Sequence, residues 1–183
     1  MIWPEYVNRN FQGPPINDNE ADYHGAYNKL LHYLFPPESD FIVTPGHLHS
    51  SNSSNSDGTD ISFEVSIGNK LPVFILQSRA SRCMDYISTR QAADLHIRQR
   101  MGDLAEYCPI PRLHAVSAIG NNLCFYHLTT EHVAPEIIPL AIPQHLTKST
   151  DTAPVTQWDC EIPSVEGERR LQKVVDEIKA MTM

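Results

Sequence analysis

The segment ISFEVSIGNKLPVFILQSR, residues 61–79, changes its pattern half-way along. Its first part alternates apolar and polar residues, which is typical of a strand with one buried face, and GNK supplies a turn. Its second part is continuously apolar from Val73 to Leu76 and indicates a buried strand. Gln77 and Arg79 then place an amide and a permanent cation where this strand should still be buried. Either the strand frays there, or it ends at a chemical site.

The segments around this hairpin carry helix and strand patterns in a definite order. Apolar residues recur at helical spacing over residues 20–35, 88–107 and 165–181, and prolines follow the first two of these helices. Residues 40–44 predict a short strand, and residues 112–130 predict a second hairpin with GNN at its tip. This order predicts an α/β domain of the α+β kind, in which one mixed sheet lies between layers of helices.

Three segments lack such a pattern. Residues 1–19 contain Pro4, Pro14 and Pro15 and predict an arm that lies over the surface. Residues 45–60 are rich in Ser and Asn and predict a flexible loop, whereas the Pro-rich residues 131–163 predict a segment that wraps the sheet. We expect one domain over residues 20–183, because a chain of 183 residues is long enough to bury one core.

The chain is acidic, with a formal net charge of -8. An acidic protein repels a phosphate backbone unless its basic residues gather on one face, so nucleic acid is a disfavoured partner that stays open. The arginines between Arg79 and Arg112 are candidates for such a face. No segment approaches the length of a membrane-spanning helix, and we therefore expect no membrane association.

The cysteines and the first ten residues bear on the compartment. Four cysteines are widely spaced, which fits neither a zinc ribbon nor a dense disulfide framework, so we expect reduced, buried thiols. The first ten residues lack the basic and apolar regions of a signal peptide. These features predict an intracellular protein, cytoplasmic or nuclear.

Two longer patterns lie beyond the first hairpin. The helix at 88–107 carries STR..AD...R.R and the next hairpin carries SA.G..L.FY, through Ser88, Thr89, Arg90, Ala93, Asp94, Arg98, Arg100, Ser117, Ala118, Gly120, Leu123, Phe125 and Tyr126. With SDF at the first strand and FILQSR at the third, the chain resembles the PD-(D/E)XK nuclease-like superfamily, and within it a group of uncharacterised fungal proteins. This resemblance covers residues 20–130. It implies a restriction-endonuclease-like three-layer core: an N-terminal helix, a central mixed sheet, a long helix after the third strand and a C-terminal helix.

The resemblance also implies a chemistry. In that superfamily, one carboxylate at the start of a strand and a second on the neighbouring strand bind Mg²⁺, an ion that prefers oxygen ligands. A lysine two residues beyond the second carboxylate lies on the same face of the strand and orients or deprotonates the attacking water. The resemblance places the first carboxylate at Asp40, the second at Gln77 and the lysine at Arg79.

Both replacements in QSR weaken this chemistry. The amide of Gln77 carries no net charge and binds a divalent cation more weakly than a carboxylate does. Arg79 stays protonated and cannot act as a base, although its planar fork binds phosphate or carboxylate well. We interpret this site as that of a pseudoenzyme, which uses no cofactor or binds Mg²⁺ weakly, and which binds an anion.

An alternative retains the metal. Asp40 and Glu64 would then be its ligands, with Glu20 on the first helix as an outer contributor. This depends on the register of the hairpin. A pairing of Ile67 with Pro72 places Glu64 on the face of the site, whereas a slip of one residue turns it to the other face.

The long helix supplies further candidates for ligand binding. Arg90, Asp94 and Arg98 lie four residues apart. They form either a ladder of salt bridges on an exposed stripe, or a site in which both arginines reach the face of Arg79 while Asp94 fixes their rotamers. His96 and Arg100 form a second stripe on this helix, which is an equal candidate for ligand binding.

Three functions remain open from the sequence. The first is a pseudo-nuclease that binds an anionic ligand or a protein partner without hydrolysis. The second is an active Mg²⁺-dependent nuclease that uses Asp40 with Glu64 or Glu20. The third is an enzyme of another class that acts on a small molecule in the ancestral cleft, because a fold alone does not fix a function.

Overall fold

In the computed structural model of the protein, the described residues are 3–13, 18, 20–48, 60–130, 136–147 and 149–182. They contain four α-helices: α1 (Glu5–Asn8), α2 (Glu20–Leu34), α3 (Ile87–Ala105) and α4 (Val165–Thr182). They also contain seven strands: β1 (Phe41–Leu48), β2 (Asp60–Ile67), β3 (Leu71–Arg79), β4 (Arg112–Ile119), β5 (Asn122–Thr129), β6 (Ile137–Ile138) and β7 (Cys160–Glu161). Two short 3₁₀ helices are η1 (Ser81–Met84) and η2 (Val155–Gln157).

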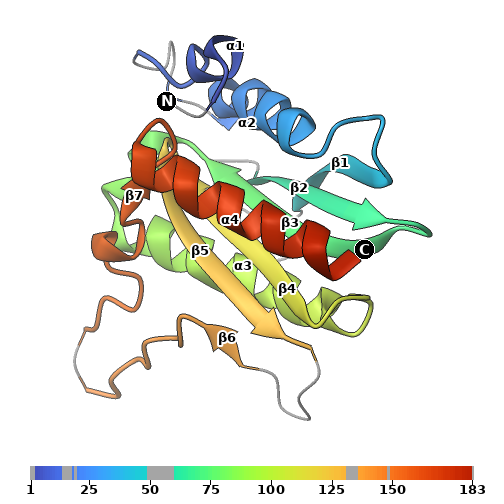
Figure 1. The fold of residues 1–183 in the computed structure, drawn as a ribbon. Coiled ribbons are helices and arrows are strands. Elements are labelled where there is room, and N and C mark those ends of the chain that lie inside the picture. The colour runs from blue at the N-terminus through green and yellow to red at the C-terminus, as the bar shows by residue number, and fades with distance from the viewer. Residues whose placement is uncertain are drawn as a thin grey trace.

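The strands form one mixed sheet in the order β1-β2-β3-β4-β5-β6, and β7 pairs with β5 (Figure 1). The β3–β4 pair is parallel, and the other described pairs are antiparallel. A parallel pair needs a crossover connection, and α3 lies in the connection from β3 to β4. The predicted α/β fold with one mixed sheet is therefore confirmed.

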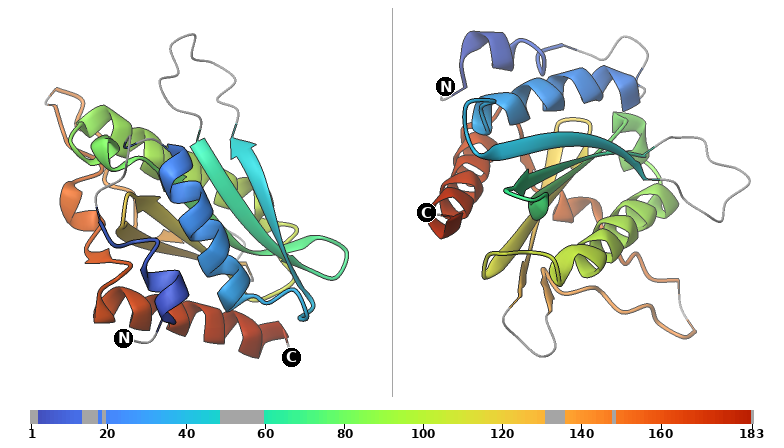
Figure 2. Two further views of the ribbon diagram at one scale, coloured as in Figure 1. Left: turned by 90° about the horizontal axis from the view of Figure 1, so that it is seen from above. Right: turned by 90° about the vertical axis from the view of Figure 1, so that its right-hand side faces the viewer.

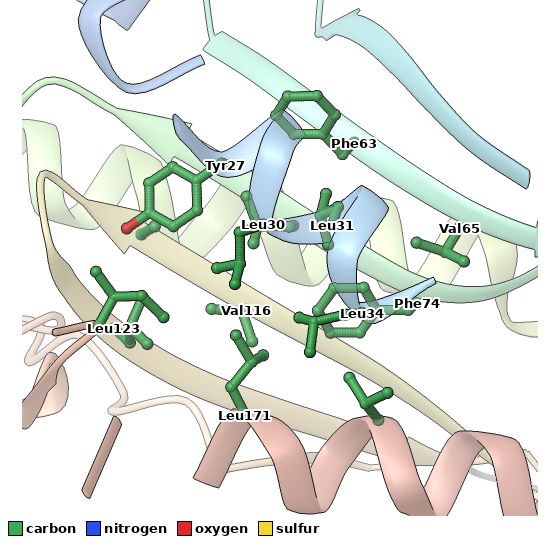
Figure 3. Close-up of a cluster of buried hydrophobic side chains, with 14 of the residues drawn as sticks. Tyr27, Leu30, Leu31, Leu34, Phe63, Val65, Phe74, Val116, Leu123 and Leu171 are labelled. Carbon is green, nitrogen blue, oxygen red and sulfur yellow. The ribbon is translucent and has the colours of Figure 1, made fainter. Parts of the chain in front are cut away.

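Helices cover both faces of this sheet (Figure 2). On one face α3 buries Ala93, Ile97 and Met101 against the sheet, as its apolar spacing predicts. On the other face α2 and α4 bury a larger cluster that includes Tyr27 and Leu171 (Figure 3). The sheet is thus the middle layer of three, and its central strands β3 and β4 carry buried side chains on both faces.

The register of the first hairpin settles the orientation of Glu64. Glu64 lies opposite Ile75 and Ser62 lies opposite Gln77, as the sequence predicts. The expected pairing of Ile67 with Pro72 is wrong, because Ile67 pairs with Leu71. An irregularity between Val65 and Ser66 takes up the difference of one residue, as a β-bulge does, so the face of Glu64 is the predicted one.

The first residues of the chain differ from the predicted surface arm. Trp3, Val7 and Phe11 are buried in the cluster between the sheet and α2 and α4. The indole Nε1 of Trp3 donates a hydrogen bond of 3.2 Å to the carbonyl of Ile162. The prolines limit regular structure here. Burial of three large apolar side chains is nevertheless favourable enough to hold this segment against the core.

The two irregular segments are shorter than their sequence patterns suggest. β1 continues to Leu48, because Pro45 and the residues after it pair with β2. The rest of the loop predicted at 45–60, up to residue 59, lies outside the described residues. Within the described part of the Pro-rich segment, β6 and β7 both add to β5.

Two predictions from composition have structural counterparts. The four cysteines are free, and three of them are buried. None of the helices in the described ranges combines the length and the apolar character that crossing a bilayer requires.

Candidate functional site

The end of β3 is not frayed. Every residue from Pro72 to Ala80 is buried, so the polar residues after Leu76 lie inside the protein. Ile75 and the cysteine-bearing part of β5 belong to the cluster under α3, and strand alternation therefore turns Gln77 and Arg79 towards α3 as well.

A polar strip crosses the sheet at this level. Ser62, Gln77 and Ser117 are neighbours on β2, β3 and β4, and all three are buried. The hydroxyl of Ser117 has no hydrogen-bond partner among the described residues. A buried hydroxyl without a partner costs free energy, so Ser117 lowers the stability of the fold at this point.

Arg79 reaches from this strip to α3. Arg79 is only 6% exposed, and its Nη2 donates a hydrogen bond to Nδ1 of His96 at 3.0 Å. Its Nη1 donates to the carbonyl of Thr89 at 3.3 Å. Because arginine only donates, Nδ1 of His96 accepts, and a neutral His96 ring carries its proton on Nε2. The structure thus brings together two of the predicted site residues.

The next turn of α3 adds an ion pair. Nε of Arg100 donates to Oε1 of Glu64 at 2.8 Å, and Nη2 contacts the same oxygen. The two side chains are 31% and 27% exposed, so this pair lies at the solvent edge of the interface. We call Glu64, Arg79, His96 and Arg100 the helix-face cluster.

Asp40 is not part of this cluster, and its predicted convergence with Arg79 is wrong. Asp40 is exposed and precedes β1, whose first residue Phe41 pairs with Ile67 beside the hairpin turn. Glu64 pairs with Thr44, four residues further along β1. At about 3.3 Å per residue, Asp40 lies roughly 13 Å along the strand from this point. The start of β1 thus lies at the opposite end of the sheet from the end of β3.

The same geometry corrects the predicted metal pair. One Mg²⁺ ion cannot bind both Asp40 and Glu64 at this separation, since its ligands lie about 2.1 Å from the ion. Glu64 is paired with Arg100, and Glu20 begins α2, which covers the other face of the sheet. Within the described residues, no three His, Cys, Asp or Glu side chains come together as metal ligands would. Asp40, Glu64 and Glu20 therefore do not come together as the predicted metal site.

Arg90 takes neither of its two predicted roles. It is buried, and its Nε and Nη1 donate to the carbonyls of Ala153 and Met84 at 2.9 and 2.6 Å. Its Nη2 donates to Asp151 at 2.7 Å. The guanidinium therefore ties α3 to η1 and to the Pro-rich segment, and it does not lie on an exposed stripe or reach Arg79.

Asp94 and Arg98 also hold structure together. Asp94 accepts from the hydroxyl of Tyr126 at 2.9 Å and from Nε of Arg98 at 2.8 Å. Arg98 also donates to the carbonyl of Pro139 at 2.8 Å. The predicted pair of Asp94 with Arg98 is present, but it is mostly buried and joins α3 to β5 and to the Pro-rich segment.

Comparison of the chain with protein-family models, with curated proteins and with solved structures found no match. The helix-face cluster is therefore interpreted from its own chemistry. Sequence reasoning named all four of its members, but it gave Arg100 the least weight. The pairing of Ser62 with Gln77 predicts Glu64 near Gln77, and no signal in the sequence pairs Glu64 with Arg100.

A second histidine, His114 on β4, is buried on the opposite face of the sheet. Burial lowers the pKa of its imidazole to about 4, and the charge of Arg112 and the neighbouring His127 add to this effect. Its Nε2 lies 3.3 Å from Oε2 of Glu177 on α4. At neutral pH the ring is therefore uncharged.

This burial predicts a loss of stability in acid. Between pH 6.5 and 4 an unfolded chain binds a proton at His114 that the folded protein does not, so the free energy of unfolding falls as the pH falls. The loss should reach about 2 kcal/mol by pH 5, measured by urea unfolding from pH 7.5 to 4.5. The variant His114→Gln should have a shallower slope over this range, and an unchanged slope would contradict the assignment.

Proposed function

We propose that this chain is a nuclease-like protein without hydrolytic activity, which binds an anionic ligand at the helix-face cluster. The observation that carries the proposal is the sign of the charge there. Two guanidinium groups and an imidazole accompany one carboxylate, at the position where the resemblance to PD-(D/E)XK nucleases implies a divalent cation. A site of this composition attracts anions and repels metal ions.

The geometry of the cluster supports binding to an oxyanion. The planar fork of Arg100 suits phosphate or carboxylate, and the buried guanidinium of Arg79, held by His96 and by the carbonyl of Thr89, adds a second positive charge near it. Glu64 and Arg100 are partly exposed, so an anion in solvent is able to exchange with Glu64 as the partner of Arg100. The concentration of positive charge stands out because the whole chain carries a net charge of -8.

The two other functions considered from the sequence lack this support. A nuclease that uses Asp40 with Glu64 needs both carboxylates at one ion, and the register separates them. A small-molecule enzyme needs a base or a nucleophile at the cleft, and the described cluster offers His96 with one nitrogen already bonded to Arg79. Binding without hydrolysis is therefore the function that we propose.

The imidazole signals of His96 provide a test that is specific to this site. Inorganic phosphate should shift the ¹H and ¹⁵N resonances of His96 in a saturable manner, as recorded by NMR. The variant Arg100→Gln should weaken this binding by about tenfold, which is the loss expected for one charge-assisted contact. Arg169→Gln removes an exposed arginine from α4 and serves as the matched control.

The same preparation is tested for hydrolysis. Single-stranded and duplex DNA and RNA should stay intact in the presence of Mg²⁺ or Mn²⁺, and neither ion should raise the melting temperature. Metal-dependent cleavage that is lost in Glu64→Gln would overturn the proposal. Phosphate binding at His96 with equal affinity in Arg100→Gln would overturn the assignment of the anion to this cluster.

A further inference from the structure

A groove of about 320 Å³ lies between α4 and the sheet face formed by β4 and β5. Arg112, His114, Phe125 and His127 line its sheet side, and α4 forms its other wall. In Figure 1, α4 crosses the front of β4 and β5 diagonally, and none of the other described helices lies in front of the part of these strands beside it. This groove is on the opposite face of the sheet from the helix-face cluster, and its volume is in the range of small-molecule sites.

The lining of the groove is rich in positive charge. Four arginine and lysine side chains contribute to it, against the carboxylates of Glu166 and Glu177. Glu166 forms two hydrogen bonds of 2.9 and 2.7 Å with Arg169, so these two charges neutralise each other at the rim. Arg170 is paired in the same way with Asp159 at 2.6 Å, so Arg112 and Lys173 remain as two cations against the single carboxylate of Glu177. Such a concave positive region raises the local concentration of anions.

Glu177 is shared among three partners on this surface. Its Oε2 lies 3.5 Å from Nη1 of Arg112 and 3.3 Å from Nε2 of His114, and its Oε1 lies 3.8 Å from Nζ of Lys173. Charge-assisted hydrogen bonds normally measure about 2.7–2.9 Å, so all three contacts are loose. One carboxylate therefore holds two cations poorly, and an oxyanion that approaches both more closely would compete with it.

The rest of the groove suits the organic part of a ligand. The guanidinium of Arg170 lies over the ring of Phe125, 4.4 Å from its centre, and forms a planar wall with it. His114 forms part of the floor, where burial leaves its ring uncharged and able to donate or accept. The groove thus combines a cationic end with a flat, partly apolar side.

We propose that this groove binds a small organic anion, whose carboxylate or phosphate group lies between Arg112 and Lys173 in competition with Glu177. The proposal does not depend on the function proposed for the helix-face cluster. A carboxylate and a phosphate ester present the same oxyanion chemistry to these two cations, so a dicarboxylate and inorganic phosphate serve as separate probes.

The imidazole NMR signals of His127, which lines the groove, report on binding in the groove, whereas those of His96 report on binding at the helix-face cluster. Malonate and inorganic phosphate are titrated separately into the full chain, and each should produce a saturable shift at His127. The double variant Arg112→Gln/Lys173→Gln should lower the affinity at least about tenfold. Glu177→Gln should raise the affinity about fivefold, because it removes the competing carboxylate but keeps the side-chain volume.

Three results would overturn the proposal. The first is no saturable shift at His127 with either probe. The second is an unchanged affinity in Arg112→Gln/Lys173→Gln, and the third is an unchanged or reduced affinity in folded Glu177→Gln. Arg9→Gln, which removes an exposed cation beside α1, is the matched control. Loss of binding at His127 in Arg100→Gln would instead place the anion in the helix-face cluster, so failure of the two proposals is distinguishable.

Discussion

Replacement of Gly167 by alanine should destabilise the protein by about 3 kcal/mol or more, which is the largest effect that we expect from a single methyl group. Gly167 lies in the first turn of α4, where its N–H donates to Oγ of Ser164 at 3.0 Å. A Cβ at this position would overlap the carbonyl oxygen of Glu161 and lie 2.8 Å from its carbon. Both atoms belong to the backbone of β7 and cannot turn aside, so α4 must move away from the sheet.

Gly102 is the matched control for this change. It lies inside α3, and a Cβ there meets no atom within 4 Å. Gly102→Ala should therefore stabilise the protein by about 0.5–1 kcal/mol, because alanine loses less backbone entropy in a helix. Urea unfolding followed by circular dichroism compares the two variants. Similar stabilities would show that α4 does not pack as closely on β7 as the structure has it.

Replacement of Arg90 by methionine should destabilise the protein by about 3 kcal/mol. The change keeps an unbranched apolar stem but removes the guanidinium that donates to Met84, Ala153 and Asp151. Two carbonyls and a carboxylate then lose a buried partner, and the Pro-rich segment loses its tie to α3. Limited proteolysis should accordingly cut the residues around 150 faster than in the unaltered protein.

This variant also separates a structural role from the ligand-binding role predicted for Arg90. A structural arginine lowers the unfolding free energy when it is replaced, and it leaves the phosphate affinity of the folded fraction at His96 unchanged. Arg169→Met, on the exposed side of α4, is the control and should leave the stability unchanged. A stable Arg90→Met variant with weaker phosphate binding would restore the ligand-binding role.

The sequence predicts the elements well because each has its own periodic signal. The apolar spacing at Ala93, Ile97 and Met101 predicts the buried stripe of α3, which the structure confirms. Alternation likewise puts Glu64 on the correct face. The register shift leaves no such signal, because the residue that the pairing skips is Val73, which lies in a continuous apolar run. The sequence pattern therefore predicts the wrong partner for Ile67.

The site was harder to predict because it depends on which strand ends meet. Asp40 was placed beside Arg79 by its position at the start of a strand, but an antiparallel neighbour brings that start to the hairpin turn. Arg90 was misjudged for a different reason. The segment that covers it is irregular and Pro-rich, and such a segment has no period from which its path could be derived.

The sequence contains little that predicts the groove beside α4. Arg170 and Lys173 have the pattern of ordinary solvent-facing charges on a helix, and Arg112 begins a strand 58 residues before Arg170. Only the crossing of α4 over β4 and β5 brings these residues together. A stretch of two consecutive arginines in an acidic chain was the available hint, and it does not indicate the partner strands.

The burial of Trp3 has a consequence for the order of events during synthesis. Its side chain hydrogen-bonds to Ile162 and its backbone to Glu168, at the start of the last helix. During synthesis, Trp3 therefore finds these partners only after the chain has been made as far as Glu168, 165 residues later. Until then the apolar residues that α4 covers in the folded protein lack that cover, and apolar surface exposed in this way favours aggregation.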